Sequence, residues 1–152
     1  MLKLDHVAIA VPDLDTAIRR WGDELGLALS GTEDVESAET STAFFPVTDG
    51  EGPPAKIELV APLGGKGPIQ KHVEKRGPGI HHLCFRTDDV RRDMQTLRAK
   101  GYRFTTEAPF SGAHDTLVCF LHPKSTGGVL IELAQYPAAD GTHPSSVEAP
   151  DA

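Results

Sequence analysis

Alternating apolar and polar residues mark two stretches of the chain, residues 4–11 and 80–87, as half-buried strands. A segment with apolar residues at helical spacing follows each of them and predicts helices over residues 14–25 and 90–100. Each segment ends before a glycine, which is a common stop signal for a helix. The residues expected to face the core from the first helix are Leu14, Ala17, Ile18, Trp21 and Leu25.

These stretches belong to a longer internal repeat. Corresponding histidines, glycines and glutamates are separated by 76, 75 and 74 positions, so one register holds along both halves. Both glutamates lie in a further apolar-rich strand. The chain therefore reads as two copies of one β-α-β-β-β unit. The corresponding pairs are His6 with His82, Gly26 with Gly101, and Glu58 with Glu132.

The repeat divides the chain into four parts and predicts an α+β fold. Residues 1–61 form the first βαβββ module, residues 80–136 form the second, and residues 62–79 link them through a short helix after Pro68. Residues 137–152 contain almost no large apolar side chains, and we expect a disordered tail there. Intervening strands are expected at residues 42–47, 103–106 and 117–121.

Two histidines and two glutamates occupy equivalent strand positions in the two modules. His6 and Glu58 are 52 positions apart, and His82 and Glu132 are 50 apart. Because successive side chains of a strand point to opposite faces, all four lie on the face away from their bulky apolar neighbours. Any one of them alone is ordinary for the solvent-facing side of a strand. The repeated pair, however, indicates one shared site.

This set of side chains is typical of a metal site. Two imidazoles and two carboxylates suit one divalent transition metal ion, such as Co, Mn, Ni, Fe or Zn. Calcium or magnesium alone would not call for histidines. His81 competes with His82 for the ligand role, but His82 aligns with His6 in the repeat, and His81 is expected toward the packed face or the strand end. His72 and His143 are expected at the solvated surface.

Composition and charge exclude several classes of partner. The 152-residue chain carries a formal net charge of −7 and 6% aromatic residues, without the basic stripe that nucleic-acid binding needs. No run of residues approaches the ~20 apolar positions of a membrane span. Cys84 and Cys119 lie 35 positions apart with no metal-binding spacing, which favours a reducing compartment. We therefore expect a cytoplasmic protein that binds a small molecule.

Five stretches carry a family resemblance: LDHVAIAVPDL from residue 4, AFFPV from residue 43, KIEL from residue 56, GIHHL from residue 79 and FLHPKSTGGVLIEL from residue 120. The chain resembles the vicinal oxygen chelate superfamily and, within it, the methylmalonyl-CoA epimerase family. The resemblance implies tandem βαβββ repeats that form a curved mixed sheet around a metal site, and a homodimer. It puts the four repeat residues, His6, Glu58, His82 and Glu132, on the metal.

The resemblance also implies an activity. Epimerases of this family interconvert (R)- and (S)-methylmalonyl-CoA by metal-assisted transfer of the α-proton through an enolate. Glu132 is the candidate proton carrier, since a ligand on the last strand would lie beside the bound substrate oxygens. Inversion needs a second donor, for which Glu39, His114 and a bound water are candidates. Lys124 is a candidate contact for the coenzyme A phosphates.

The chain departs from the family pattern near its second expected strand. It has residues 37–40, SAET, where many relatives read Glu-Gln-Gly-Val, Thr42 where some relatives place an acid, and an insertion over residues 48–55. Three other functions stay open. A glyoxalase I-type lactoylglutathione lyase uses the same four ligands, an extradiol dioxygenase needs one ligand fewer, and a non-catalytic small-molecule binding protein would be expected to lose ligands.

Overall fold

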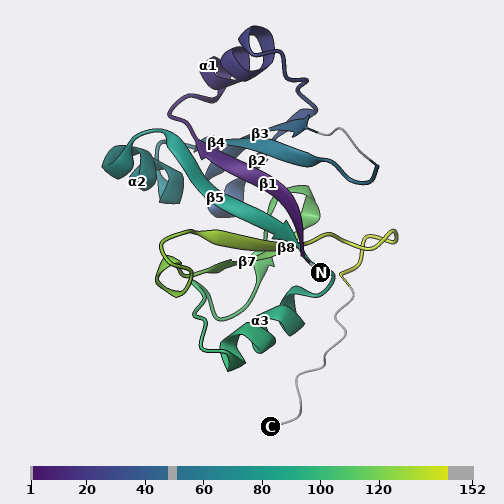
Figure 1. The fold of residues 1–152 in the computed structure, drawn as a ribbon. Helices are drawn as coiled ribbons and strands as arrows, with labels where there is room; N and C mark the ends of the chain where they lie inside the picture. Colours follow the sequence, from purple (N-terminus) through teal and green to yellow (C-terminus); the bar gives the residue numbers. More distant parts are fainter. Residues whose placement is uncertain (1, 48–50, 144–152) are drawn as a thin grey trace. The chain divides into compact units, whose positions relative to one another are not determined.

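The computed structural model describes residues 2–47 and 51–143 and separates into two compact units (Figure 1). One unit runs from Asp5 to His82, and the other contains the residues from Leu83 onward together with those up to Leu4. Both halves of the chain have the element order β-α-β-β-β, so the predicted α+β tandem repeat is confirmed. Among the described residues, no helix is long and apolar enough to cross a membrane.

Four strands build the sheet of the Asp5–His82 unit, in the order β2-β3-β4-β1. Their bounds are β1 (Lys3–Ala10), β2 (Gly31–Val35), β3 (Thr40–Val47) and β4 (Ala55–Pro62). β1 is parallel to β4, whereas the other two pairs are antiparallel. The hydrophobic pattern does not reveal β2, because this edge strand carries charged residues that blunt its unpaired side.

The helix of this unit starts as predicted but ends differently. Asp13 caps α1 (Leu14–Ile18) by accepting a hydrogen bond from the backbone N–H of Thr16 at 3.0 Å. The helix continues as a π-helix, η1 (Arg19–Glu24), in which Leu25 donates its N–H to the carbonyl five residues earlier. This wider turn shifts the register of the last residues, so Leu25 is 60% exposed. The expectation that Leu25 faces the core is therefore wrong.

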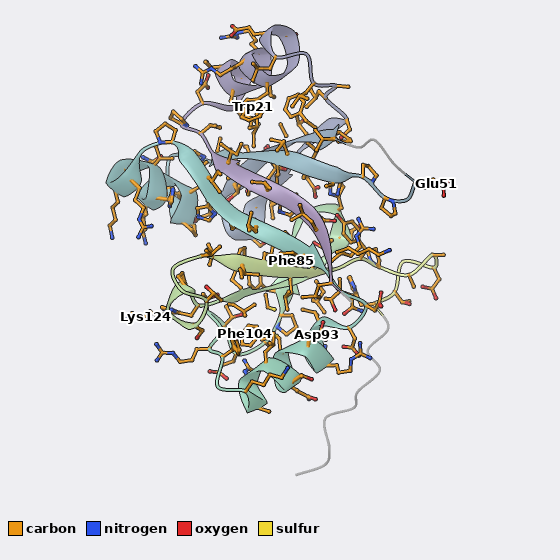
Figure 2. The ribbon with its side chains drawn as sticks, viewed as in Figure 1. Trp21, Glu51, Phe85, Asp93, Phe104 and Lys124 are labelled. Atoms are coloured by element: carbon orange, nitrogen blue, oxygen red, sulfur yellow. The ribbon has the colours of Figure 1, made fainter. Side chains whose placement is uncertain are left out.

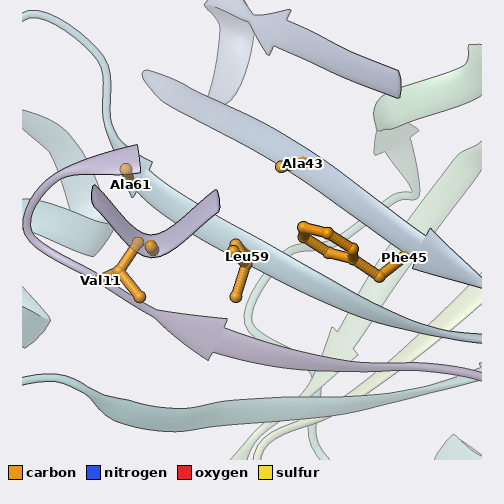
Figure 3. Close-up of a cluster of buried hydrophobic side chains, with 6 residues drawn as sticks. Val11, Ala43, Phe45, Leu59 and Ala61 are labelled. Atoms are coloured by element: carbon orange, nitrogen blue, oxygen red, sulfur yellow. The ribbon is translucent and has the colours of Figure 1, made fainter. Parts of the chain in front are cut away.

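The apolar core of this unit lies between its sheet and α1. Figure 3 shows the buried side chains that the strands contribute to it. Phe45 on β3 and Leu59 on β4 are completely buried, and Trp21 packs against the same cluster (Figure 2). Leu59 follows Glu58 directly on β4, so the two side chains point to opposite faces: one face of the sheet packs on the helix and the other carries polar groups. The buried cluster contains Val11, Ala17, Ala43, Phe45, Leu59 and Ala61.

The second half of the chain repeats this topology. Its strand order is β5-β8-β7-β6, and its first and last strands, β5 and β8, are again parallel. The helix packs on β7 and β8, and its residues Val90 and Met94 are buried there. The elements are β5 (Gly79–Arg86), α3 (Val90–Ala99), β6 (Phe110–Ser111), β7 (Leu117–Leu121) and β8 (Ile131–Gln135), with single turns η3 (Ala113–Asp115) and η4 (Pro123–Ser125) beside β7.

The strand expected over residues 103–106 does not form. Phe104 makes only an isolated bridge with Leu121, and its ring joins the core beneath α3 (Figure 2). The Arg98 guanidinium of α3 donates hydrogen bonds to the carbonyls of Thr106 and Glu107, at 3.3 and 2.7 Å. The segment therefore pairs with β7 only around Phe104 and then contacts α3, and the short β6 is the edge strand.

The linker between the modules contains the predicted helix, α2 (Gly67–Arg76). A single turn, η2 (Glu36–Ala38), connects β2 and β3 in the first module. In the expected disordered tail, residues 138–143 contain a turn in which Gly141 donates its N–H to the Ala138 carbonyl at 2.8 Å. Residues 144–152 of that tail, and residues 48–50 of the insertion, lie outside the described residues. The disorder of the tail stays a prediction.

Candidate metal centre and active site

Three of the four predicted ligands meet inside the Asp5–His82 unit. His6 on β1 and Glu58 on β4 share one face of the sheet, because Ala8, two residues after His6, is the register partner of Glu58. The Nε2 atom of His6 lies 2.6 Å from Oε2 of Glu58. His82 contributes a second imidazole, whose Nε2 lies 3.2 Å from Nε2 of His6. All three residues are buried.

The donor atoms of this cluster fit a divalent transition metal. Nε2 of His6 faces both the second imidazole nitrogen and the carboxylate oxygen, and the two rings meet edge to face at 5.3 Å between centroids. Buried polar groups of this kind are costly unless they bind each other or a cation. Two facing Nε2 atoms can bond to each other only if one carries a hydrogen. A cation bound by both nitrogens takes the place of that hydrogen.

A buried ion pair contacts the other side of the His6 ring. Nδ1 of His6 lies 2.7 Å from Oδ2 of Asp5, and Nζ of Lys56 lies 3.6 Å from the same oxygen. Asp5 is only 2% exposed. Sequence reasoning missed both residues, because strand alternation assigns Asp5 to the face opposite His6. The one available signal is an acidic residue directly before a predicted ligand.

Two further histidines extend the cluster. Nδ1 of His81 lies 2.8 Å from Nδ1 of His82, and the His81 ring meets the ring of His72 edge-on at 4.7 Å between centroids. The expected surface position of His72 is wrong, because its ring packs on His81 and the residue is half-buried. Burial, and then repulsion from Arg76, lower the pKa of His72 below its ordinary value. His81 thus lies between two histidine rings.

Glu132, the fourth predicted ligand, belongs to the other compact unit. It lies on β8, where its register partners are Cys84 of β5 and Phe120 of β7, and it is 8% exposed. Burial, and then the charge of Glu132, raise the pKa of the Cys119 thiol to about 12. Glu132 is therefore a buried carboxylate on a strand that lies between β5 and β7. Its burial matches that of Glu58, its counterpart in the repeat.

The other predicted site residues occupy turns. Glu39 follows η2 in a left-handed conformation with φ 50°, and its Oε1 lies 3.5 Å from Nζ of Lys66. His114 also has a positive φ, 56°, and is exposed in η3. Lys124 is exposed in η4, where its backbone N–H donates to Nδ1 of His122 at 3.1 Å (Figure 2). Within its own unit, His114 and Lys124 are exposed and Glu39 is partly exposed.

One carboxylate on the polar face of the first sheet was not singled out from the sequence. Thr42 on β3 is buried and donates its hydroxyl hydrogen to the Glu33 carbonyl of β2 at 2.8 Å. Glu33 is the register partner of Thr42, and Thr42 is the partner of Val60, two residues after Glu58. Glu33, Thr42 and Glu58 therefore share one face of the sheet. Glu33 is a further candidate acid on that face.

Comparison with known proteins identifies the family of the chain. The family model of the Glyoxalase/Bleomycin resistance protein/Dioxygenase superfamily matches residues 5–120. The chain is also 37% identical to the mitochondrial methylmalonyl-CoA epimerase of Dictyostelium discoideum, over 88% of this chain and 78% of that protein. The chain belongs to the methylmalonyl-CoA epimerase family of this superfamily. The family predicted from the sequence motifs is thereby confirmed.

Other members of the epimerase family extend this comparison. The ethylmalonyl-CoA/methylmalonyl-CoA epimerase of Cereibacter sphaeroides is 38% identical over 88% of this chain and 97% of that protein. A variant of Streptomyces coelicolor methylmalonyl-CoA epimerase, solved in complex with 2-nitronate-propionyl-CoA, has a TM-score of 0.84 at 32% identity, covering 90% of this chain and 98% of that chain. The lactoylglutathione lyase of Haemophilus influenzae is more distant, at 30% identity over 79% of this chain and 84% of that protein.

Proposed function

We propose that the chain is an epimerase that interconverts (R)- and (S)-methylmalonyl-CoA by moving the α-proton through an enolate. The observation that carries the proposal is the buried cluster of His6, Glu58 and His82 on one sheet face of a chain in the methylmalonyl-CoA epimerase family. Removing the proton between a thioester and a carboxylate leaves negative charge on the thioester oxygen. Groups fixed where that charge develops lower the barrier to its formation.

The similar Streptomyces enzyme supports this chemistry. It was solved with 2-nitronate-propionyl-CoA, an acyl-CoA in which a nitronate group stands at the position of the reacting carbon. A nitronate is planar at this carbon and carries negative charge on oxygen, as an enolate does. A site that accommodates it is complementary to the shape and charge of the enolate, and such complementarity accelerates proton abstraction.

One divalent transition metal ion is the proposed cofactor, namely Co, Mn, Ni, Fe or Zn. His6, Glu58, His82 and Glu132 would hold it, the first three by the contacts within their own unit and Glu132 by its equivalence to Glu58 in the repeat. Bound there, the ion would act as a Lewis acid toward the thioester and carboxylate oxygens of the substrate. The mixture of nitrogen and oxygen donors favours these metals over magnesium or calcium.

Glu132 is the proposed proton carrier on one face of the substrate. A general base must lie within hydrogen-bonding reach of the proton that it removes, and a ligand of the shared site would meet that need. Inversion also requires a donor on the opposite face. Glu39 and His114 are the candidates from the sequence, and Glu33 joins them because it shares a sheet face with Glu58.

A contact for coenzyme A, a dimeric state and a cytoplasmic location belong to the same proposal. Lys124 is exposed in η4 and is proposed to bind the phosphates of coenzyme A, whose negative charges need cations near the mouth of the site. The protein is proposed to act as a homodimer in the cytoplasm, without nucleic-acid or membrane partners. Its formal net charge of −7 makes a local cation such as Lys124 more important for holding an anionic substrate.

The decisive experiment is deuterium exchange into the substrate. The metal-loaded protein is incubated with each epimer of methylmalonyl-CoA in heavy water, and the α-carbon is followed by NMR. We expect deuterium to enter this carbon and both epimers to appear, because the enolate can be protonated from either face. A parallel assay with methylglyoxal and glutathione tests for lactoylglutathione lyase activity, which we do not expect. Absence of exchange with both epimers would refute the proposed function.

A second experiment tests the metal site by measuring the metal content of the purified protein. Protein purified without chelator is expected to contain about one equivalent of a divalent transition metal per chain, measured by elemental analysis. His6→Ala removes an imidazole from the centre of the cluster and should abolish most of this binding. His122→Ala, which removes an imidazole that caps η4, is the matched control and should retain the metal. Unchanged metal content in His6→Ala would contradict the assignment.

A further inference from the structure

The Asp5–Lys56 ion pair contacts Nδ1 of His6, whereas Glu58 contacts Nε2 of the same ring. We propose that Asp5, held by Lys56, is a positioning residue that orients His6 and fixes which nitrogen of its ring is available to the metal. The inference rests on the proposed metal site and concerns a part of it that no ligand assignment includes. It depends on three contacts, each within the Asp5–His82 unit.

Asp5 and the proposed metal lie on opposite nitrogens of the His6 ring. Nε2 faces Glu58 at 2.6 Å and His82 at 3.2 Å, so a metal held among these groups requires the lone pair of Nε2. The hydrogen of the neutral ring must then lie on Nδ1, where Asp5 accepts it at 2.7 Å, since an ionised carboxylate accepts hydrogen bonds but cannot donate them. Asp5 therefore directs the lone pair of His6 toward the other predicted ligands.

Lys56 explains why a charged Asp5 is tolerated at this depth. The Asp5 side chain is 1% exposed and the Lys56 side chain 15% exposed, with 3.6 Å between Nζ and Oδ2. A buried carboxylate without a partner would strongly destabilise the folded chain, as happens when one member of a buried ion pair is removed. Lys56 is the register partner of His6, so the β1–β4 pairing itself brings the cation to the carboxylate.

The second imidazole of the cluster has a different support. Nδ1 of His82 lies 2.8 Å from Nδ1 of His81, so one of these two rings donates and the other accepts. An imidazole partner can take either role by changing tautomer, whereas a carboxylate has only one. Of the two imidazoles, His6 is therefore the one whose tautomer is specified more strictly by its partner. A carboxylate partner also raises the basicity of a ligating imidazole, and loss of such a partner commonly costs about 10–100-fold in metal affinity.

The test measures metal affinity directly. Metal-free protein, prepared with a chelator, is titrated with Co²⁺ and followed by calorimetry and by the visible absorption of the bound ion. Asp5→Ala is expected to raise the dissociation constant for Co²⁺ by about 10–100-fold and to change the absorption spectrum. Asp5→Asn keeps an oxygen that accepts the Nδ1 hydrogen and should bind more tightly than Asp5→Ala. Asp34→Ala, at an exposed aspartate that accepts from Ser41, is the matched control and should bind as wild type does.

The outcomes separate this inference from the proposed function. If Asp5→Ala binds Co²⁺ with wild-type affinity and spectrum, the positioning role is refuted even if the protein epimerises its substrate. If wild-type protein exchanges no α-proton while Asp5→Ala loses Co²⁺ affinity as expected, the function fails and the positioning role stands. Equal losses in Asp5→Asn and Asp5→Ala, together with equally lowered melting temperatures of the metal-free proteins, would indicate a purely structural role and overturn the inference.

Discussion

Glu132→Gln is expected to lower the rate of epimerisation by about 10²–10⁴-fold while the protein keeps its metal. Glutamine preserves the shape of the side chain and an oxygen donor, but it lacks the basicity that proton transfer requires. Glu132 lies buried on β8, so the amide would stay in the position of the carboxylate. The measurements are turnover with each epimer of methylmalonyl-CoA and elemental analysis of the same protein preparation.

Glu58→Gln is the matched control for this prediction. Glu58 occupies the equivalent position in the first module and is buried to a similar degree, so the substitution removes the same charge from the counterpart strand. We expect this variant to keep most of its activity and its metal, because Glu58 is assigned only a ligand role. A Glu132→Gln protein that binds metal and epimerises at the wild-type rate would assign the base to another residue. Glu33, Glu39 and His114 would then be tested in turn.

Phe45→Ala is expected to lower the free energy of unfolding of the Asp5–His82 unit by about 3–5 kcal/mol. The Phe45 ring is completely buried between β3 and the helix, in contact with the cluster drawn in Figure 3. Its removal leaves a cavity that neighbouring residues fill only in part. Such a loss is a large share of the roughly 5–15 kcal/mol that stabilises a typical domain. Urea unfolding followed by Trp21 fluorescence reports on this unit, since Trp21 is the one tryptophan of the chain.

Leu25→Ala is the control that distinguishes the observed packing from the packing that helical spacing predicts. Leu25 is 60% exposed because the π-helical turn moves it away from the core. Its truncation should change stability by less than about 0.5 kcal/mol. If the substitution instead costs several kcal/mol, Leu25 would lie in the core, as a regular α-helix would place it. The helix would then lack the π-helical turn in solution.

Much of the fold could be predicted because the relevant signals are local. The alternation along residues 4–11 and 80–87, the cap at Asp13 and the repeat spacing each depend on residues close in sequence or on a direct internal comparison. Errors arose where long-range contacts override the local pattern. The strand expected over residues 103–106 is reduced to a single bridge, while the Arg98 side chain binds the carbonyls of residues 106 and 107. β2 carries too few apolar residues to be recognised, since an edge strand depends on its neighbour for pairing.

The candidate site could likewise be predicted only in part from the sequence. His6, Glu58 and His82 could be selected because they occupy equivalent positions of a repeat, and in the structure Nε2 of His6 lies 2.6 Å from Glu58 and 3.2 Å from His82. Glu33 could not be selected, because its place on the polar face follows from the register of β2 against β3. Asp5 could not be selected either, because its carboxylate turns back to the ring of the following residue.

The sequence by itself determined that this chain repeats a βαβββ unit, which four residues the repeat makes equivalent, and which family its motifs resemble. These properties follow from residue identity and spacing, which the unfolded chain already possesses. Only the tertiary structure decided that Lys56 neutralises Asp5, that His72 packs on His81, and that Leu25 leaves the core. Each of these depends on strand register or on the pitch of a helical turn, and both are settled by the balance of packing and hydrogen bonding across the whole unit.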